Sequence, residues 1–457
     1  MRVDLPTFRA HTRAALADQL LQQSIENASG NFSDGREKAL GDLPDSEALR
    51  DQLKLIRAAT LANLTEHLEE FERNATAAGV VVHWAQDASE ACEIVIALAK
   101  ERGISQVVKT KSMVSEEIQL NSALEGAGIR PVETDLGEWI VQLAAEPPSH
   151  IIAPAVHKTK EQVADLFSDE LGRSVEADIA ALTAAARDAL RGDFLSAQMG
   201  ITGGNILVAE SGTLVLVTNE GNGRMVTSLP PVHVAVVGIE KVVPSWEQAE
   251  VWLSLLSRSA TGQPLSIYTN LITGPARPGE LDGPQEVHLV LLDNQRSSYL
   301  GTQFEEMFGC IRCGACLNVC PVYTKVGGHA YRSPYSGPMG AVLTPLLFGK
   351  GQFSALPQAS TLCGACLDVC PVRIDLPRML LQLREEQVEA GRLPWLGVWV
   401  ERAAAWVMTK PKLYRMLSLL ARKFGGTRLA KLFIPFPIPE ISQQTFHQLW
   451  KSRELEE

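Results

Sequence analysis

The sequence predicts an α/β domain with a mostly parallel sheet, followed by a small cysteine-rich helical domain and a helical C-terminal tail. Three observations support this order. Short apolar runs alternate with helical patterns between residues 76 and 295, which is typical of a parallel sheet covered on both faces. Seven of the eight cysteines then lie between Cys310 and Cys370. After residue 386, tryptophans recur at helical spacing.

Residues 1–75 are predicted to form a helical N-terminal segment. A break at Leu43-Pro44-Asp45 is followed by leucines and isoleucines that recur near helical spacing from Leu49 to Leu68. We expect an amphipathic helix with one face toward solvent, and docking against another part of the chain is the alternative.

Composition narrows the class of protein. The 457 residues suffice for two or three domains. A net charge of −11 argues against nucleic acid as a partner. No apolar run follows Met1-Arg2-Val3-Asp4, so no secretory signal is expected. No stretch reaches the roughly 20 apolar residues of a membrane span. We therefore expect a cytoplasmic protein.

Residues 76–295 are predicted to form one α/β domain. Helical patterns at Ala88–Arg102 and Glu116–Ala127 separate the first apolar runs, and the later part is richer in strands. The runs interpreted as strands are Gly79–Trp84, Gln106–Lys109, Ile129–Thr134, His150–Pro154, Asn205–Ala209, Thr213–Val217, Val232–Val237 and Val287–Leu292.

Polar and glycine-rich segments follow several of these runs. In open α/β sheets, ligands bind beyond the carboxyl ends of the strands. Lys111 and Arg224 are candidates to hold a carboxylate, and Glu210 is a candidate base. The alternative is that these segments are ordinary turns. No Gly-x-Gly-x-x-Gly follows a strand, so a nicotinamide or flavin site has no support.

A cysteine run opens the region 300–385. From Cys310 to Pro321 the chain reads Cys-x2-Cys-x2-Cys-x3-Cys-Pro, the spacing with which bacterial ferredoxins hold iron–sulfur clusters. A structural zinc site or a disulfide pair is the alternative, but zinc ligands usually come as two Cys-x2-Cys pairs without the terminal Cys-x3-Cys-Pro. The run predicts a ferredoxin-type domain.

A second, shorter run repeats the first from Cys363 to Pro371. In two-cluster ferredoxins the last cysteine of each run binds the other cluster. Ser360 stands where a fourth ligand of the second cluster is expected, so that cluster is predicted as 4Fe–4S or 3Fe–4S and the first as 4Fe–4S. His329, between the runs, is either a replacement ligand or a surface residue. The predicted iron ligands are Cys310, Cys313, Cys316 and Cys370 for cluster 1, and Cys320, Cys363 and Cys366 for cluster 2.

The tail, residues 386–457, differs from the rest. Trp395, Trp399 and Trp406 share one helical pattern, and residues 402–431 carry eight Lys or Arg and no Asp or Glu. An apolar stripe accompanies them, formed by Leu413, Met416, Leu417, Leu420 and Phe424. Packing on the protein's own acidic body or docking to a partner is the first interpretation. Peripheral contact of residues 402–431 with the inner face of a membrane is the second.

Together these features resemble the lactate utilisation protein B family. The resemblance is carried by the two cysteine runs, by Gly327-Gly328-His329 between them, by the tryptophan-bearing tail and by the segments Gly203-Gly204-Asn205 and Glu210-Ser211-Gly212-Thr213, which are similar to the family's LUD domain. The family's second cysteine run also has three cysteines. The resemblance implies an α/β fold of the isomerase and CoA-transferase class, and a complex with two other lactate utilisation subunits that converts L-lactate to pyruvate.

We therefore expect an iron–sulfur electron-transfer subunit with an unknown electron acceptor. One alternative is an enzyme in its own right, either an oxidoreductase or a Lewis-acid enzyme, that uses the α/β pocket and an open cluster. Another is an iron–sulfur redox sensor, which the acidic net charge disfavours.

Overall fold

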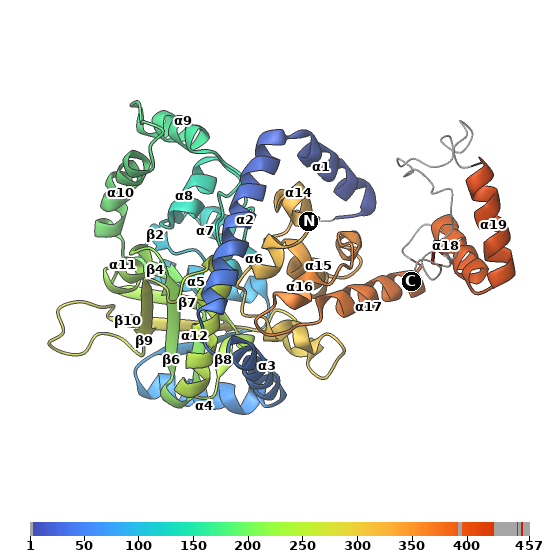
Figure 1. Ribbon diagram of the computed structural model, residues 1–457. Helices are drawn as coiled ribbons and strands as arrows, with labels where there is room; N and C mark the ends of the chain where they lie inside the picture. The colour runs from blue at the N-terminus through green and yellow to red at the C-terminus, as the bar shows by residue number, and fades with distance from the viewer. Residues whose placement is uncertain (1–2, 392–394, 425–445, 447–448, 451–457) are drawn as a thin grey trace. The chain divides into compact units, whose positions relative to one another are not determined.

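The computed structural model describes residues 3–391, 395–424, 446 and 449–450. The chain forms two compact units, residues 1–386 and 387–457. Figure 1 shows the arrangement of the helices and strands within each unit. Among the described residues, none of the helices is long and apolar enough to cross a bilayer.

A six-stranded sheet lies at the centre of the first unit. Its strand order is β1-β10-β7-β4-β2-β3, and every neighbouring pair is parallel. The strands are rich in β-branched residues, which favour extended backbone. Their bounds are β1 (Val81–Ala85), β2 (Gln106–Lys109), β3 (Arg130–Glu133), β4 (Met199–Thr202), β7 (Val232–Gly238) and β10 (Glu286–Leu292).

Both faces of this sheet are covered. Along β7, Val234 and Val236 pack into the core beneath α5 (Ala88–Glu101), α6 (Met113–Glu117) and α7 (Leu120–Gly126), whereas Ala235 and Val237 pack into the opposite core. That second core also contains α4 (Leu64–Ala77) and a smaller sheet. Alternate side chains thus enter different cores, so the strand is apolar except for the buried His233.

The smaller sheet has the order β8-β5-β6-β9. Strands β5 and β6 form an antiparallel hairpin, β9 pairs antiparallel with β6, and β8 pairs parallel with β5. This smaller sheet accompanies the mostly parallel sheet that the sequence predicts. The bounds of its strands are β5 (Ile206–Val208), β6 (Thr213–Thr218), β8 (Val242–Val243) and β9 (Tyr268–Ile272).

Three further helices flank the sheets: α8 (Leu136–Leu143), α11 (Asn222–Ser228) and α12 (Trp246–Thr261). Two more helices, α9 (Lys160–Leu171) and α10 (Ile179–Ser196), pack against one another at the edge near β3.

Two predictions in this region were wrong. The run His150–Pro154 is a loop and not a strand, because the imidazole Nδ1 atom of His150 accepts the backbone N–H groups of Ile152 and Ala153 at 3.0 and 3.1 Å. The expected helix Glu116–Ala127 is two helices, because Gln119 between them adopts a left-handed φ of 54°.

The N-terminal helices pack against the cysteine-rich region. They are α1 (Leu5–Ala17), α2 (Gln19–Gly41), α3 (Ser46–Ala62) and α4. Ile25 of α2 and Leu53 of α3 share a core with Phe308, which precedes the first cysteine run, and with Leu317, which lies within it. The docked alternative for this segment is therefore the one that the structure shows.

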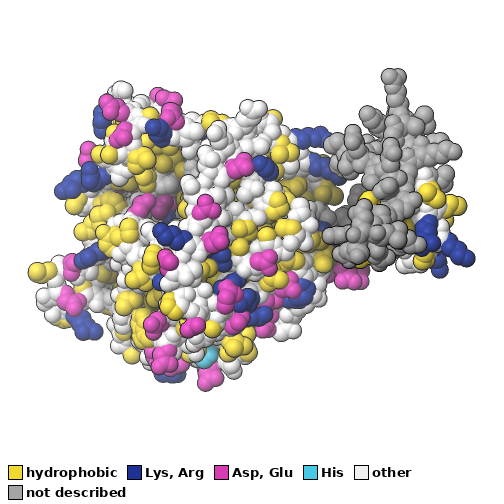
Figure 2. All heavy atoms as spheres, in the orientation of Figure 1, with side chains coloured by type: hydrophobic (Ala, Val, Ile, Leu, Met, Phe, Trp, Pro, Cys, Tyr) yellow, Lys and Arg dark blue, Asp and Glu magenta, His cyan; other side chains and the backbone are white. Residues whose placement is uncertain are grey.

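The cysteine-rich region consists of short helices around a buried core. Figure 2 shows acidic and basic side chains interspersed over one face of the unit that contains it. Its helices are α13 (Ala315–Asn318), α14 (Tyr323–Val326), α15 (Gly337–Phe348), α16 (Ala365–Asp368) and α17 (Leu376–Glu389).

The second unit contains α18 (Trp395–Met408) and α19 (Pro411–Phe424). Trp399 and Trp406 are exposed by 62% and 59%. Met416 and Leu417 of the expected apolar stripe are also exposed. The side chains of Trp395, Leu420 and Phe424, and the residues from 425 to 431, lie outside the described residues.

Candidate iron–sulfur site

Four cysteines converge on one cavity. Cys310, Cys313 and Cys316 from the first run and Cys370 from the second line the same space, and apolar side chains such as Ile151 complete its wall. These are the four residues that the spacing predicts as ligands of cluster 1. Four thiols around an apolar cavity are a donor set suited to an iron–sulfur cluster, so the residues present fit the group that the sequence implies.

The thiols of this set influence one another. Burial raises the pKa of Cys313 to about 12, and the nearby thiols of Cys370 and Cys310 add to the shift. Burial likewise raises the pKa of Cys370 to about 11, with a further contribution from Cys310. Such thiols are protonated at neutral pH in the metal-free protein, so iron must displace their protons on binding.

The backbone of the first run is shaped for this convergence. Arg312 and Gly314, on either side of Cys313, both have left-handed φ angles, of 59° and 79°. Cys313 between them is not left-handed, so the sign of φ alternates along these three residues. Such alternation turns successive N–H groups toward one side, as in anion-binding nests. The N–H of Arg312 points at the Sγ atom of Cys310 at 3.4 Å.

The other three cysteines form a second set. Burial raises the pKa of Cys366 to about 12, and the thiols of Cys320 and Cys363 raise it further. Cys320 and Cys366 are buried, whereas Cys363 is exposed. The remaining cysteine, Cys92, is buried in α5, where its thiol donates to the carbonyl oxygen of Ile118 at 3.4 Å. Cys92 is therefore a core residue, as its apolar surroundings in the sequence suggest.

His329 lies in a different group from the second set. Its Nε2 atom donates to the carbonyl oxygen of Pro147 at 2.7 Å, and its ring packs edge to face on His157 with the ring centroids 4.5 Å apart. His157 in turn contacts Glu146 through Nε2 at 2.7 Å. His329 thus connects the cysteine-rich region to the loop that follows α8.

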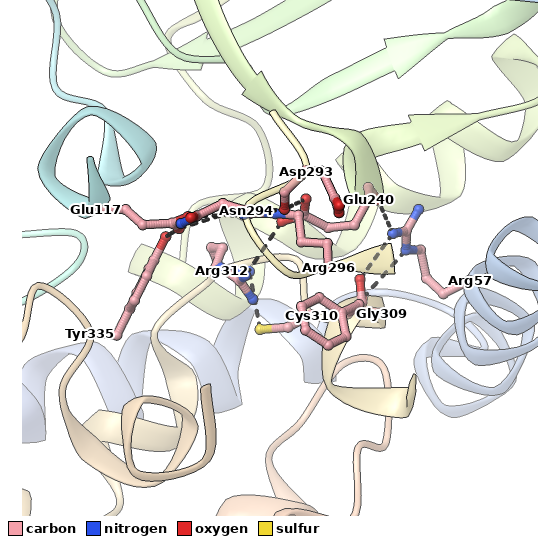
Figure 3. Close-up of polar contacts among 11 residues, drawn as sticks. Arg57, Glu117, Glu240, Asp293, Asn294, Arg296, Gly309, Cys310, Arg312 and Tyr335 are labelled. Atoms are coloured by element: carbon pink, nitrogen blue, oxygen red, sulfur yellow. Dashed lines mark hydrogen bonds and ion pairs between the residues drawn. The ribbon is translucent and has the colours of Figure 1, made fainter. Parts of the chain in front are cut away.

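A buried charge network reaches the first set (Figure 3). Arg296 forms a two-pronged ion pair with Glu117, with both N–O distances 2.8 Å, and contacts Glu240 at 2.6 Å. Glu240 also faces Arg312 at 3.4 Å. Burial alone would raise the pKa of Glu240, but neighbouring cations, with Arg296 first among them, outweigh it and lower the pKa to about 2. The network holds the side chain of Arg312 beside Cys310.

Helices α2 and α3 supply cations to the second run. Arg50 donates from Nη2 to the carbonyl oxygen of Cys370 at 2.9 Å. Arg36 donates from Nη2 to the carbonyl oxygen of Val369 at 2.7 Å. These carbonyls end α16, where backbone acceptors lack helical partners. Sequence reasoning missed both arginines, because their partners lie more than 300 residues away along the chain.

A larger cavity adjoins the first set of cysteines. It has a volume of about 550 Å³ and lies at the carboxyl ends of β2, β3 and β6, where its polar lining includes Lys111, Asp135 and Glu220. Burial raises the pKa of Glu220 to about 7, and the charge of Asp135 adds to the shift. Burial lowers the pKa of Lys111. Arg312 belongs to the walls of both this cavity and the cysteine-lined one.

The structure does not bring together the three residues proposed as a catalytic group. Lys111 lines the large cavity, but the carboxylate of Glu210 accepts the backbone N–H of Trp246 at 2.7 Å and so caps α12. Arg224 lies exposed on α11. Sequence reasoning missed Asp135 and Arg312. The signal for Asp135 was its position just beyond a predicted strand, whereas Arg312 was hidden inside the cysteine run.

Comparisons with known proteins place both regions in described families. A family model described as LUD domain matches residues 68–292, and a 4Fe-4S dicluster domain matches residues 306–374. The α/β LUD domain, the ferredoxin-type iron–sulfur domain and the helical C-terminal region are thus confirmed. Among solved structures, a DUF162 family protein from Deinococcus radiodurans matches 50% of this chain and 98% of its own at 14% identity, with a TM-score of 0.27.

Three relatives named lactate utilization protein B align along most of the chain. The Oceanobacillus iheyensis protein is 44% identical over 91% of this chain and 87% of its own. The Geobacillus kaustophilus protein is 44% identical over 95% and 90%, and the Exiguobacterium protein is 48% identical over 87% and 84%. On this identity and coverage, the chain belongs to the lactate utilization protein B family.

Proposed function

We propose that this chain is the iron–sulfur electron-transfer subunit of a complex that oxidises L-lactate to pyruvate. The observation that carries the proposal is the convergence of Cys310, Cys313, Cys316 and Cys370 on one cavity, with a second set of three cysteines beside it. The names of the relatives supply the substrate. Removal of two electrons from lactate suits a subunit that can hold two one-electron centres.

The proposal includes one 4Fe–4S cluster on the first set and a 4Fe–4S or 3Fe–4S cluster on the second. When bound, such clusters accept and donate single electrons at potentials set by their surroundings. The chain's own contribution is electrostatic. Arg312 stands beside Cys310, and Arg36 and Arg50 lie near Cys370. These cations stabilise the additional negative charge of a reduced centre.

The partners are part of the proposal. Two other lactate utilisation subunits would deliver electrons to this chain, and an unknown acceptor would take them from it. We place the complex in the cytoplasm. Helix α19 exposes Tyr414, Met416 and Leu417 beside the exposed cations Lys412 and Arg415. An apolar surface next to cations suits docking to an acidic partner first, and peripheral contact of residues 402–431 with an anionic membrane second.

An anaerobic reduction experiment tests the electron-transfer role. The full chain with reconstituted clusters is mixed with L-lactate, first alone and then with the two partner subunits, and iron–sulfur absorbance and low-temperature EPR are followed. Bleaching only in the presence of the partners is the expected result. No bleaching with the partners, while dithionite still reduces the clusters, would contradict the proposal.

A second candidate function is that this chain oxidises the substrate itself. The observation in its favour is that Arg312 belongs to the walls of both cavities, so a ligand in the 550 Å³ cavity would lie close to cluster 1. None of the cluster 2 cysteines, Cys320, Cys363 and Cys366, is among the described residues that line that cavity, which favours electron transfer past Arg312 over Lewis-acid chemistry at cluster 2. Bleaching by the chain alone, lost in Lys111→Met but kept in the exposed control Lys160→Met, would support it.

A further inference from the structure

Ser360 stands in the second cysteine run at the position that Cys310 holds in the first. When the runs are aligned, the two glycine-alanine pairs and the two final Cys-Pro pairs coincide. The only ligand position at which the two runs differ is this one. The aligned pairs are Cys310 with Ser360, Cys313 with Cys363, Cys316 with Cys366, and Cys320 with Cys370.

The backbone repeats as well as the sequence. Leu362, which precedes Cys363, has a left-handed φ of 57°, against 59° for Arg312 in the first run. Gly364 has a φ of 89°, against 79° for Gly314. A left-handed conformation is unfavourable for a branched residue such as leucine. The second loop therefore keeps the cluster-binding shape of the first, although it begins with serine.

The side chain of Ser360 also matches that of Cys310. The N–H of Arg312 donates to Cys310 Sγ at 3.4 Å, and the equivalent N–H of Leu362 donates to Ser360 Oγ at 3.1 Å. The hydroxyl oxygen thus takes the place of the thiol sulfur in the local hydrogen bond. An ordinary serine turn would form the same bond, and the experiment below separates the two cases.

Arg384 of α17 holds this loop in place. Its Nη2 atom donates to the carbonyl oxygen of Ser360 at 2.9 Å, and its Nε atom donates to that of Pro357 at 2.8 Å. Ser360 is half-buried, whereas Cys363 is exposed. The fourth position of the second set is therefore fixed by the fold and lies close to solvent.

We propose that Ser360 Oγ is the fourth protein ligand of the second cluster, which makes that cluster 4Fe–4S. The Ser360 hydroxyl would lose its proton to solvent as its oxygen binds the iron that Cys320, Cys363 and Cys366 leave without a protein ligand. The inference rests on the part of the proposed function that places a cluster on these three cysteines, and it is independent of lactate and of the partners.

The test uses full-length protein reconstituted anaerobically with ⁵⁷Fe, as wild type, Ser360→Ala, Ser360→Cys and the control Ser354→Ala. Mössbauer spectra count the iron sites, and EPR spectra of the reduced protein in H₂¹⁷O report whether a solvent oxygen binds iron. The wild type is expected to show four irons in cluster 2 and no ¹⁷O broadening of its signal. Ser354→Ala should match the wild type.

Loss of the ligand has a defined signature. Ser360→Ala should either lose one iron from cluster 2 or acquire ¹⁷O broadening, and Ser360→Cys should restore four irons with no broadening. A three-iron cluster 2 or ¹⁷O broadening in the wild type would overturn the proposal, as would a Ser360→Ala spectrum identical to that of the wild type. A chain that holds no cluster on the second set at all would overturn the proposed function as well.

Discussion

Arg312 Nη2 lies 3.4 Å from Oε1 of Glu240, and this contact joins the first cysteine run to the end of strand β7. Glu240 is held in turn by Arg296 at 2.6 Å (Figure 3). The guanidinium of Arg312 also lies over the ring of Tyr335, 5.3 Å from its centroid. A cation beside Cys310 is thus fixed in place by residues of the LUD domain and of the cysteine-rich region.

The first prediction concerns the reduction potential of cluster 1. Replacement Arg312→Gln removes a positive charge beside Cys310 and should lower that potential by roughly 40–170 mV. A charge pair of this kind is worth about 1–4 kcal/mol, and 59 mV corresponds to a tenfold change for one electron. Arg312→Lys should restore most of the potential. An EPR-monitored redox titration measures it, with the exposed Arg332→Gln as control. An unchanged midpoint in Arg312→Gln would show that the cation does not tune cluster 1.

The second prediction concerns the stability provided by the buried network. Arg296→Met leaves the carboxylates of Glu117 and Glu240 without their main cation and should destabilise the first unit by about 3–5 kcal/mol. The control Arg130→Met breaks an ion pair with Asp193 in which the arginine side chain is 60% exposed, and should cost about 0–1 kcal/mol. Urea denaturation of both variants gives the comparison. Equal losses would mean that the network is no stronger than a surface pair.

The two cysteine runs were predictable because their geometry is local. Ligands spaced two residues apart must lie on one loop, so the spacing of Cys310, Cys313 and Cys316 carries the chemistry whatever the rest of the chain does. The large cavity is different. Its charged residues Lys111, Asp135, Glu220 and Arg312 come from separate segments. The pairing of β2 with β3 brings Lys111 and Asp135 together, but Glu220 follows β6 of the smaller sheet and Arg312 lies in the cysteine run.

The failed strand prediction at His150–Pro154 has a tertiary cause. Its apolar run has the composition of a buried strand, but Ile151 is buried because it lines the cavity of the first cysteine set. His150 Nε2 contacts Oδ1 of Asn318 in α13 at 3.1 Å. The run is thus apolar because a second region of the chain packs on it, and no local pattern distinguishes that reason from membership of a sheet.

The third prediction is a pH dependence of stability that arises from His150. Burial, and then the charge of Lys111, lower the pKa of His150 to about 3, whereas an unfolded histidine has a pKa of about 6.5. Between these values the unfolded chain binds more protons, so His150 makes stability rise with pH, by up to about 1.4 kcal/mol per pH unit. Its contribution is complete above about pH 6.5 and is lost as the pH falls toward 3.

Replacement His150→Gln should therefore flatten the dependence of the melting temperature on pH between 6.5 and 5. The exposed His11→Gln should leave the slope of the wild type. Anaerobic calorimetry of the cluster-loaded chain at several pH values measures both. Parallel curves for the wild type and His150→Gln would show that His150 already takes up its proton in the folded state.

The last prediction tests the contact between the cysteine-rich region and the LUD domain. A Cβ atom on Gly328 would lie 1.8 Å from the carbonyl oxygen of Ser149, and the φ of Gly328 is an ordinary −74°. Gly328→Ala therefore introduces a packing clash without backbone strain. We expect a loss of about 1–3 kcal/mol in stability. We also expect faster release of iron, because the displaced loop includes His150, which contacts Asn318 of α13 within the first cysteine run. The control Gly30→Ala, in α2 with no atom near its Cβ position, should instead gain about 0.5–1 kcal/mol. Urea denaturation and the rate of iron release to a chelator measure these effects. If Gly328→Ala releases iron at the rate of the wild type despite its lower stability, then the cysteine-rich region holds its clusters without support from this contact.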